Sequence, residues 1–278
     1  MTIAILGADG MLGSEVTACL RQAGHDCRLA CQPAFDITSA DQLAAVTAGA
    51  DAIVNCAAYT NVDGAEAQRD LAFAVNARAV GQLGELAARR RQYVLHISTD
   101  FVYDGLKSEP YTEADAPRPL SVYGETKWQG EQHLAASGCA HAIVRIEWTY
   151  GRHGRHFVSK LLERASQQPE LAVVSDQIGA PTPTTAVADV LRQALDHRLE
   201  GTYLYAAAGY GTRFEVACWV VAQLGLPVSV RPCLTADFPA PAQRPLNSRF
   251  ACDRLDRALG LRRQPWQDLL TAYLEQGQ

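Results

Sequence analysis

The feature that most constrains this chain is a run of closely spaced glycines directly after its first apolar segment. Residues 3–6 are apolar, and Gly7, Gly10 and Gly13 follow in a GxxGxxG pattern that leads into a helical pattern. Glycines at this spacing permit a tight turn between a strand and a helix, and they let backbone N–H groups approach a pyrophosphate. Their position between a strand and a helix predicts a dinucleotide-binding turn. The residues expected to line the cofactor here are Gly7, Gly10, Met11 and Leu12.

Short apolar runs alternate with helical patterns through the first half of the chain. This alternation predicts a doubly wound parallel sheet of the Rossmann type, an α/β fold with helices on both faces. Runs such as AIVN, VLHI and AIVR are apolar almost throughout, as expected of strands buried on both faces. We expect strands at 3–6, 27–30, 52–55, 93–97 and 141–146, and helices at 12–23, 70–90 and 122–136.

The second half of the chain has a less regular pattern. Prolines between Pro232 and Pro245 mark a long loop, and loops of that length are often functional. We expect a dinucleotide-binding Rossmann domain over 1–146, to which 183–206 returns, and a smaller α+β substrate domain built mainly from 147–278. The expected helices are 157–167, 187–196, 214–224 and 266–273, and the expected strands are 171–174, 202–205 and 228–230.

Composition and charge exclude several classes of protein. Hydrophobic residues make up 48% of the 278 residues and charged residues 20%, as in ordinary globular proteins. The formal net charge of -5 argues against a nucleic-acid-binding surface, and no run approaches the ~20 apolar residues that span a membrane. The eight cysteines form no CxxC pair and the chain starts without a basic leader, so we expect reduced thiols and a cytoplasmic protein.

A tyrosine and a lysine stand four residues apart in the helical pattern at 122–136. Tyr123 and Lys127 therefore share one face of the expected helix. A free phenol titrates near ~10, and a nearby ammonium stabilises the phenolate and lowers that pKa, so the pair suits acid–base chemistry. The preceding strand ends in Ser98, Thr99 and Asp100, at the edge of the sheet where doubly wound folds bind ligands. Thr99 or Ser98 can there hydrogen-bond a substrate oxygen.

The glycine turn, the strand that ends in Thr99 and the YxxxK pair together resemble the extended short-chain dehydrogenase/reductases. Finer matches resemble the dTDP-4-dehydrorhamnose reductase family over nearly the whole chain, in order. The most specific of them are AAYTNVD, DQIGAPT and RPLNS. The segments that carry the resemblance are GADGMLG from Gly7, DIT from Asp36, NCAAYTNVDGAE from Asn55, VNA from Val75, STDFVYDG from Ser98, PLSVYGETKWQGE from Pro119, RIEWTYG from Arg145, DQIGAPT from Asp176 and RPLNS from Arg244.

The resemblance implies an NADPH- or NADH-dependent oxidoreductase that reduces the C4 keto group of a nucleotide-linked 6-deoxy-4-keto sugar. It implies that Thr99, Tyr123 and Lys127 form a catalytic triad. In this triad Tyr123 donates the proton, Thr99 polarises the ketone, and Lys127 tunes Tyr123 and holds the nicotinamide ribose. The other expected cofactor-binding residues are Asp36, Ile37, Ala57, Ala58 and Tyr59, and the expected substrate-binding residues are Thr60, Val62, Asp100, Phe101, Trp148 and Arg244.

Three of these residues have a second interpretation. Asp36 either flanks the adenine ring or begins the next helix, and Trp148 either approaches the sugar or packs in the core. Arg244 either contacts the phosphates of the nucleotide or stiffens its proline-rich loop through a salt bridge. The second strand ends at Cys31 and Gln32, which supply neither an acid for a free 2′-hydroxyl nor an arginine for a 2′-phosphate, so NADPH and NADH both stay open.

The chain departs from the family pattern at several positions. Glu147 stands where a small residue usually precedes the tryptophan, and Gln32 stands where arginine is common. Some members bind magnesium at a dimer interface, and Glu15 matches one carboxylate there, but Thr185 lies where another is expected. We therefore predict no required metal, while a homodimer is compatible with the resemblance.

Two other functions match parts of the pattern. A nucleotide-sugar epimerase of the same superfamily would use the same cofactor turn but return its hydride to the substrate. A non-catalytic binding subunit, similar to the regulatory subunit of methionine adenosyltransferase, would share the fold. Sugar 4,6-dehydratases pair an aspartate with a glutamate, and Phe101 after Asp100 disfavours that reaction here. The joint presence of Thr99, Tyr123 and Lys127 favours the reductase.

Overall fold

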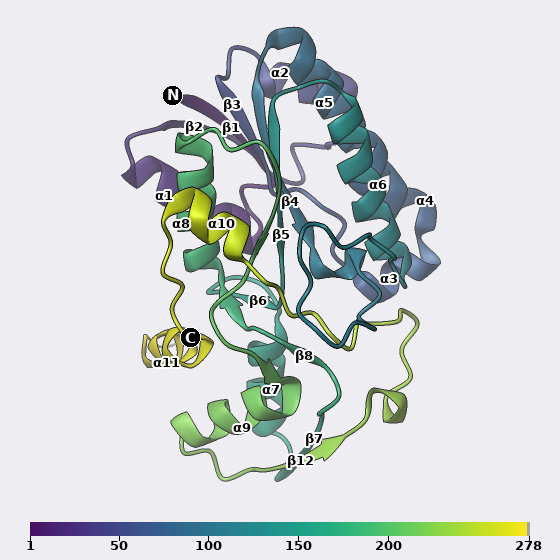
Figure 1. Cartoon of the computed structure of the whole chain (residues 1–278), viewed down its shortest axis with the longest axis vertical. Helices are drawn as coiled ribbons and strands as arrows, with labels where there is room; N and C mark the ends of the chain where they lie inside the picture. The colour runs from purple at the N-terminus through teal and green to yellow at the C-terminus, as the bar shows by residue number, and fades with distance from the viewer. Residues whose placement is uncertain (277–278) are drawn as a thin grey trace.

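The central element of the fold is a six-stranded parallel sheet (Figure 1). The structure is a computed structural model that describes residues 1–276. The strands lie in the order β10-β5-β4-β3-β1-β2, and every neighbouring pair is parallel. This sheet confirms the predicted doubly wound α/β fold. Its strands are β1 (Thr2–Leu6), β2 (Asp26–Ala30), β3 (Ala52–Asn55), β4 (Tyr93–Thr99), β5 (His141–Ile146) and β10 (Gly201–Tyr205).

Helices cover both faces of the sheet because the strands are apolar on both. Ile3 and Ile5 of β1 belong to the core on one face, whereas Ala4 and Leu6 belong to the core on the other. Figure 1 shows the two helical layers on opposite sides of the strands. One layer contains α1 (Met11–Gln22), α8 (Thr184–Asp196) and α10 (Asp253–Leu259), and the other contains α2 (Ala40–Thr47), α5 (Ala79–Arg90) and α6 (Val122–Ala136).

The helix expected over 70–90 contains an irregular turn. α4 (Arg69–Phe73) continues through a π-helical turn at Ala74–Arg78 into α5. Asn76 in this turn is buried, and its side-chain amide bonds the backbone N–H and carbonyl of Tyr59 and the hydroxyl of Thr126. Turns of this kind are rare and often lie at functional sites. Here the turn holds the segment after β3 against α6.

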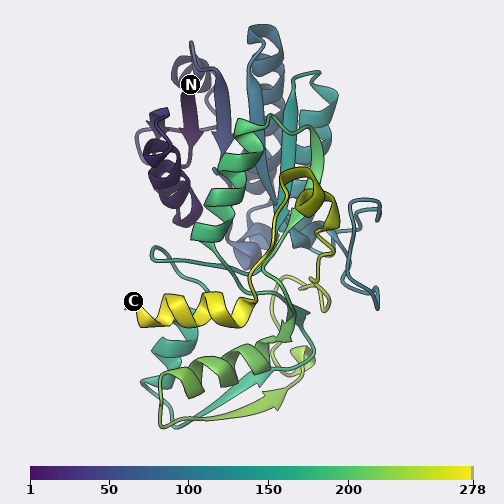
Figure 2. The same ribbon diagram turned by 60° about the vertical axis from the view of Figure 1, so that its left-hand side comes forward.

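The second half of the chain forms a smaller part of the molecule beside the carboxyl ends of the sheet strands (Figure 2). Its core contains Trp266 and Leu270 of the last helix together with Val216 and Val220. The segment with α8 and β10 returns to the large sheet, while the domain boundaries expected from the sequence stay a prediction. The elements of this part are α7 (Phe157–Ala165), β7 (Glu170–Val174), α9 (Arg213–Gln223), β12 (Ser229–Cys233) and α11 (Trp266–Glu275), and β7 pairs with β12 in parallel.

Several short elements were not expected from the sequence. The helices α2, α3 (Val62–Ala67) and α10 have 8, 6 and 7 residues, which is too short for a clear helical repeat. The strand expected at 228–230 extends to Cys233, and the proline-rich loop contains a 3-10 turn at Thr235–Asp237. The remaining elements are a 3-10 turn at Asp100–Val102 and the two-residue strands β6 (Thr149–Tyr150), β8 (Ile178–Gly179), β9 (Thr182–Pro183) and β11 (Gly211–Thr212).

A buried ion pair joins β5 to α6. The Arg145 Nε lies 2.9 Å from the Glu131 Oε1, and the two side chains are 4% and 2% exposed. The Arg145 Nη1 also donates to the Tyr103 hydroxyl at 2.6 Å, so every charged group of the pair has a hydrogen-bond partner. A charge pair this deeply buried is tolerated only with such complete bonding.

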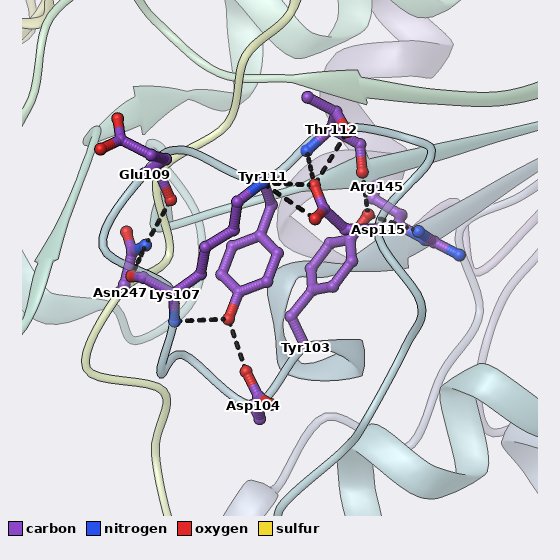
Figure 3. Close-up of polar contacts among 9 residues, drawn as sticks. All are labelled: Tyr103, Asp104, Lys107, Glu109, Tyr111, Thr112, Asp115, Arg145 and Asn247. Carbon is purple, nitrogen blue, oxygen red and sulfur yellow. Dashed lines mark hydrogen bonds and ion pairs between the residues drawn. The ribbon is translucent and has the colours of Figure 1, made fainter.

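Tyr103 connects this ion pair to the long loop at 104–115 (Figure 3). Its ring stacks on that of Tyr111 with 4.3 Å between ring centroids. Lys107 and Asp115 form an ion pair at 2.8 Å within the loop. The Asn247 amide donates to the backbone carbonyls of Lys107 and Glu109 at 2.7 and 2.9 Å. The loop is therefore bonded to the RPLNS segment, far from it in the sequence.

We expect Arg145→Leu to lower the free energy of unfolding by about 3–5 kcal/mol, because it leaves the Glu131 carboxylate buried and unpaired. Urea unfolding followed by circular dichroism measures this change. In the control, Arg145→Leu combined with Glu131→Leu should recover most of the loss, since both charges are then removed. A single variant as stable as the wild type would show that the pair is not needed for stability.

Candidate active site

A cleft of about 610 Å³ lies at the carboxyl ends of β1, β3, β4 and β5. Ligands of doubly wound folds bind at this edge of the sheet. The cleft brings together all but two of the residues predicted from the sequence, Tyr59 and Arg244. Those that line it are Gly7, Gly10, Met11, Leu12, Asp36, Ile37, Ala57, Ala58, Thr60, Val62, Thr99, Asp100, Phe101, Tyr123, Lys127 and Trp148.

The glycine turn forms one wall of the cleft, and its backbone leaves no room for side chains. Gly7 has a φ of +74°, and a Cβ there would lie 2.8 Å from the Ala57 backbone. A Cβ on Gly13 would lie 2.0 Å from the Gly7 carbonyl oxygen. The first turn of α1 has no side-chain cap, so its N–H groups are free to bind an anion. The turn therefore matches the shape and the chemistry that a dinucleotide pyrophosphate requires.

Tyr123 and Lys127 face the same cleft from the first two turns of α6. The Ser121 hydroxyl caps this helix by accepting from the Gly124 N–H at 3.2 Å. A Cβ on Gly124 would lie 2.1 Å from the Phe101 carbonyl oxygen, so glycine lets the helix start close to the end of β4. The ring of Phe101 packs edge-on against that of Tyr123 with centroids 5.4 Å apart. This packing orients the phenol toward Thr99.

Burial controls the protonation of both side chains. It raises the pKa of Tyr123 to about 12, against a smaller lowering by a hydrogen bond with Thr99. Burial also lowers the pKa of Lys127 to about 8. The lysine Nζ donates to the Ile97 carbonyl at 2.7 Å. The expected lowering of the Tyr123 pKa by Lys127 is therefore wrong for this structure, because desolvation of the phenol dominates.

Two polar residues behind the lysine were missed by the sequence analysis. His96 is fully buried next to Lys127, with 3.4 Å between its Nε2 and the lysine Nζ. Burial, and then the charge of Lys127, hold the pKa of His96 well below its usual value. Asn55 reaches the histidine Nδ1 at 3.1 Å and accepts from the Ala57 N–H. A signal existed in the sequence, since His96 interrupts an apolar strand and Asn55 ends one.

An acidic pair, Asp100 and Glu147, directly follows the ends of the paired strands β4 and β5. Asp100 accepts hydrogen bonds from the hydroxyls of Thr99 and Ser248, and burial raises its pKa. Glu147 is 1% exposed, with one oxygen bonded to the Ala180 N–H and the other without a partner among residues 1–276. Burial, and then the charge of Asp100, raise the pKa of Glu147 well above its usual value. The surroundings of Glu147 therefore disfavour the charged form of its carboxyl group.

Arg213, the first residue of α9, was also missed. Its guanidinium lies 3.5 Å from the centroid of the Trp148 ring, and burial lowers its pKa to about 10. Trp148 has a φ of +44°, and it lines the cleft beside this arginine. Two interpretations of Trp148 were open. Its place on the cleft wall agrees with a sugar contact, and its packing at the edge of the core of the smaller part agrees with a structural role. No spacing in the sequence connects Arg213 with Trp148.

Tyr59 and Arg244 lie outside the cleft wall. The Tyr59 ring packs beside Phe73 and Val122, so only its backbone, bonded to Asn76, is near the cleft. Arg244 forms a salt bridge with Asp63 at 2.7 Å, which is the stiffening role considered for it. It also lines a neighbouring cavity of about 900 Å³, to which Asp100, Phe101, Trp148 and Arg213 contribute as well.

Asp36 does not cap the helix that follows it. Its carboxylate accepts from the N–H and the hydroxyl of Thr38, whereas the Ser39 hydroxyl caps α2. The helix-start interpretation of Asp36 is therefore wrong, and the residue lies on the cleft wall with Ile37.

Other features of the described chain concern metal, membrane and thiol chemistry. Residues 1–276 hold no cluster of three or more metal-ligating side chains, and every helix in this range is too short or too polar to span a bilayer. All eight cysteines are free. Cys56 lines the cleft, but burial raises the pKa of its thiol to about 12, which leaves it a poor nucleophile.

Comparison with known proteins gives matches over the full length of the chain. Residues 1–278 match the family model described as RmlD substrate binding domain. The dTDP-4-dehydrorhamnose reductase of Sinorhizobium fredii (strain NBRC 101917 / NGR234) is 37% identical, over 96% of this chain and 95% of that protein. The enzyme of the same name from Escherichia coli (strain K12) is 34% identical, over 96% and 95%.

Solved structures give the same result. A dTDP-4-dehydrorhamnose reductase from Clostridium acetobutylicum superposes with a TM-score of 0.96 at 33% identity, over 99% of both chains. One from Bacillus anthracis, solved in complex with NADP, superposes with a TM-score of 0.95 at 31% identity, again over 99% of both chains.

We expect Gly10→Val to weaken the binding of NADPH and NADH by about 10-fold or more. The valine side chain would intrude on the pyrophosphate, and the loss of one or two charged hydrogen bonds corresponds to a change of this size. A Cβ on Gly10 would meet only the Gly7 carbonyl oxygen, at 3.3 Å, and Gly10 has a φ of -72°, so the fold should accept the valine. Fluorescence titration of each cofactor measures affinity, and an unchanged melting temperature without cofactor is the control. Undiminished binding would contradict the assignment of the turn.

We expect Glu147→Gln to raise the melting temperature at pH 8 but not at pH 4.5. Because the pKa of Glu147 is raised in the folded protein, its burial costs stability increasingly as pH rises above the ordinary value of 4.5. The glutamine removes this cost and should raise the melting temperature by about 2–4 °C for each kcal/mol of stability recovered. Thermal unfolding at both pH values tests it. An equal difference at the two pH values would rule out a proton-linked cost at Glu147.

Proposed function

Because the chain belongs to the dTDP-4-dehydrorhamnose reductase family, we propose that it uses NADPH or NADH to reduce the C4 keto group of dTDP-4-dehydrorhamnose, giving dTDP-L-rhamnose. The observation that supports this most strongly is the meeting of Thr99, Tyr123 and Lys127 with the glycine turn in one cleft. A bound dihydronicotinamide supplies the hydride for such a reduction.

Tyr123 is the proton donor in this proposal. With a pKa raised to about 12 by burial, its phenol keeps its proton at neutral pH. It can therefore protonate the oxygen at C4 as negative charge develops there. The Thr99 hydroxyl, at the end of β4, donates to the same oxygen and polarises the carbonyl. In this structure the Thr99 hydroxyl donates its one proton to Asp100 at 2.9 Å, so the hydroxyl has to turn away from Asp100 to donate to the substrate oxygen.

Lys127 holds the nicotinamide ribose in this proposal. Its Nζ is anchored on the Ile97 carbonyl at 2.7 Å, which leaves further ammonium protons free for the ribose hydroxyls. The neutral His96 and Asn55 behind it stabilise its position without adding charge. A buried ammonium close to the reacting oxygen also offsets the charge that forms there.

The cavity next to the cleft offers a place for the rest of the substrate. It shares Trp148 and Arg213 with the cleft, so a sugar at the junction can reach both. Lys160 and Arg244 line it and can pair with phosphates. Its volume of about 900 Å³ is in the range of small-molecule sites.

We also place the protein in the cytoplasm. All eight of its cysteines are free, and reduced thiols are typical of that compartment.

The test is incubation of the protein with dTDP-4-dehydrorhamnose and each reduced cofactor, followed at the nicotinamide absorbance. We expect cofactor oxidation in step with substrate loss, and Tyr123→Phe should slow turnover by about 100-fold or more with little change in cofactor affinity. The matched control is Tyr93→Phe. Tyr93 is the first residue of β4, away from the cleft, and its hydroxyl donates to the Leu199 carbonyl.

The outcomes separate the possible functions. Isomerised sugar without net cofactor oxidation would indicate an epimerase. Tight cofactor binding without any turnover would indicate a binding subunit. Wild-type turnover by the Tyr123→Phe variant would exclude Tyr123 as the proton donor.

A further inference from the structure

We propose that the protein discriminates against NADPH in favour of NADH, and that the discrimination lies at the end of β2, around Gln32 and Asp36. This inference deepens the proposed function, on which it rests for the assignment of the cleft to a dinucleotide. NADPH differs from NADH only by a phosphate on the 2′-hydroxyl of the adenosine ribose. Proteins that accept this phosphate place a cation beside it, whereas those that select NADH place a carboxylate there.

The end of β2 is adjacent to the glycine turn. The N–H groups of Gly7 and Ala8 donate to the carbonyl of Ala30, the last residue of β2, at 2.9 and 3.2 Å. Ala30, Gln32 and Asp36 then line the cleft. In doubly wound folds the adenosine ribose lies beside the end of the second strand. These residues are therefore the ones that a 2′-phosphate would meet.

No cation lines the cleft on this side. Among the described residues that line it, the only lysine and arginine side chains are Lys127, Arg155 and Arg213. Lys127 is anchored at the end of β4, and Arg213 stacks on Trp148. Arg155 follows Gly154, which lies over Met11 at the start of α1, and its guanidinium pairs with Glu163 at 3.0 Å. Each of the three is thus engaged away from β2.

The one cation of β2 points elsewhere. The guanidinium of Arg28 donates to the Ala48 carbonyl at the end of α2. A helix C-terminus attracts positive charge, so this contact holds the arginine in place. Arg28 is not part of the cleft wall, and it leaves Gln32 as the polar side chain next to Ala30.

The charge on this side of the cleft is negative. Asp9 and Asp36 both line it. Hydrogen bonds from Thr38 hold the pKa of Asp36 below its usual value, so this carboxylate is ionised at neutral pH. A phosphate monoester carries about -1.5 to -2 charges at pH 7. It would be repelled by these carboxylates, whereas a free 2′-hydroxyl can donate a hydrogen bond to Asp36.

The first experiment measures the Kd values of NADH and NADPH by fluorescence titration of the whole protein, without sugar. We expect NADPH to bind at least about 10-fold more weakly. The difference should shrink between 20 and 300 mM salt, because salt screens exposed charges. Equal or tighter binding of NADPH at low salt would overturn the proposal. Since no substrate is present, this result is independent of whether the protein reduces dTDP-4-dehydrorhamnose.

The second experiment adds a cation at the proposed position. Gln32→Arg should tighten NADPH binding about 10-fold or more, which one charged hydrogen-bond pair can supply. Gln32→Leu is the matched control for size without charge, and it should not tighten NADPH binding. Arg28→Ala should leave the ratio of the two Kd values unchanged. A loss of NADPH binding in Arg28→Ala, or equal gains in the arginine and leucine variants, would refute the proposal.

Discussion

The site depends on one constraint, the close packing of the glycine turn between the end of β1, the segment after β3 and the start of α1. Gly13 lies so close to the Gly7 carbonyl that a Cβ would be 2.0 Å from its oxygen, and a Cβ on Gly7 would be 2.8 Å from the Ala57 backbone. Because no side chain separates them, the start of α1 and the ends of β1 and β3 meet at one point. The uncapped N–H groups of α1 therefore face the same cleft as the side chains that follow β4.

Desolvation gives the cleft its chemical character. The same burial raises the pKa values of Tyr123 and Glu147 and lowers the pKa of Lys127. A low local dielectric also strengthens each hydrogen bond made there. The site thus combines neutral donors with a single ammonium held between a backbone carbonyl and a neutral imidazole.

The sequence predicted the sheet and its glycine turn because strong local signals specify both. Continuous apolar runs mark buried strands, and the spacing of Gly7, Gly10 and Gly13 has few structural alternatives. The short helix α3 gave no usable repeat, and the π-helical turn at Asn76 depends on a tertiary contact with Tyr59. Local patterns carry no information about such contacts.

For the site, residues in motifs were easier to predict than residues brought in from other segments. Thr99, Tyr123 and Lys127 belong to motifs, and they do share one cleft. Arg213 comes from a helix start more than sixty positions beyond Trp148, and only the folded chain pairs them. The protonation of Tyr123 also depends on how much water its surroundings exclude, which its spacing from a lysine does not determine.

The path of the chain has a consequence for how the molecule can be divided. After β5 the chain enters the smaller part, returns to the sheet as α8 and β10, leaves again through α9 and β12, and comes back as α10 before ending in α11 (Figures 1 and 2). Neither part is a contiguous stretch of sequence, so no single cut in the gene yields either one whole. The backbone also crosses between the two parts several times. These crossings restrain wide hinge opening and leave adjustment around a ligand to the loops and side chains of the cleft.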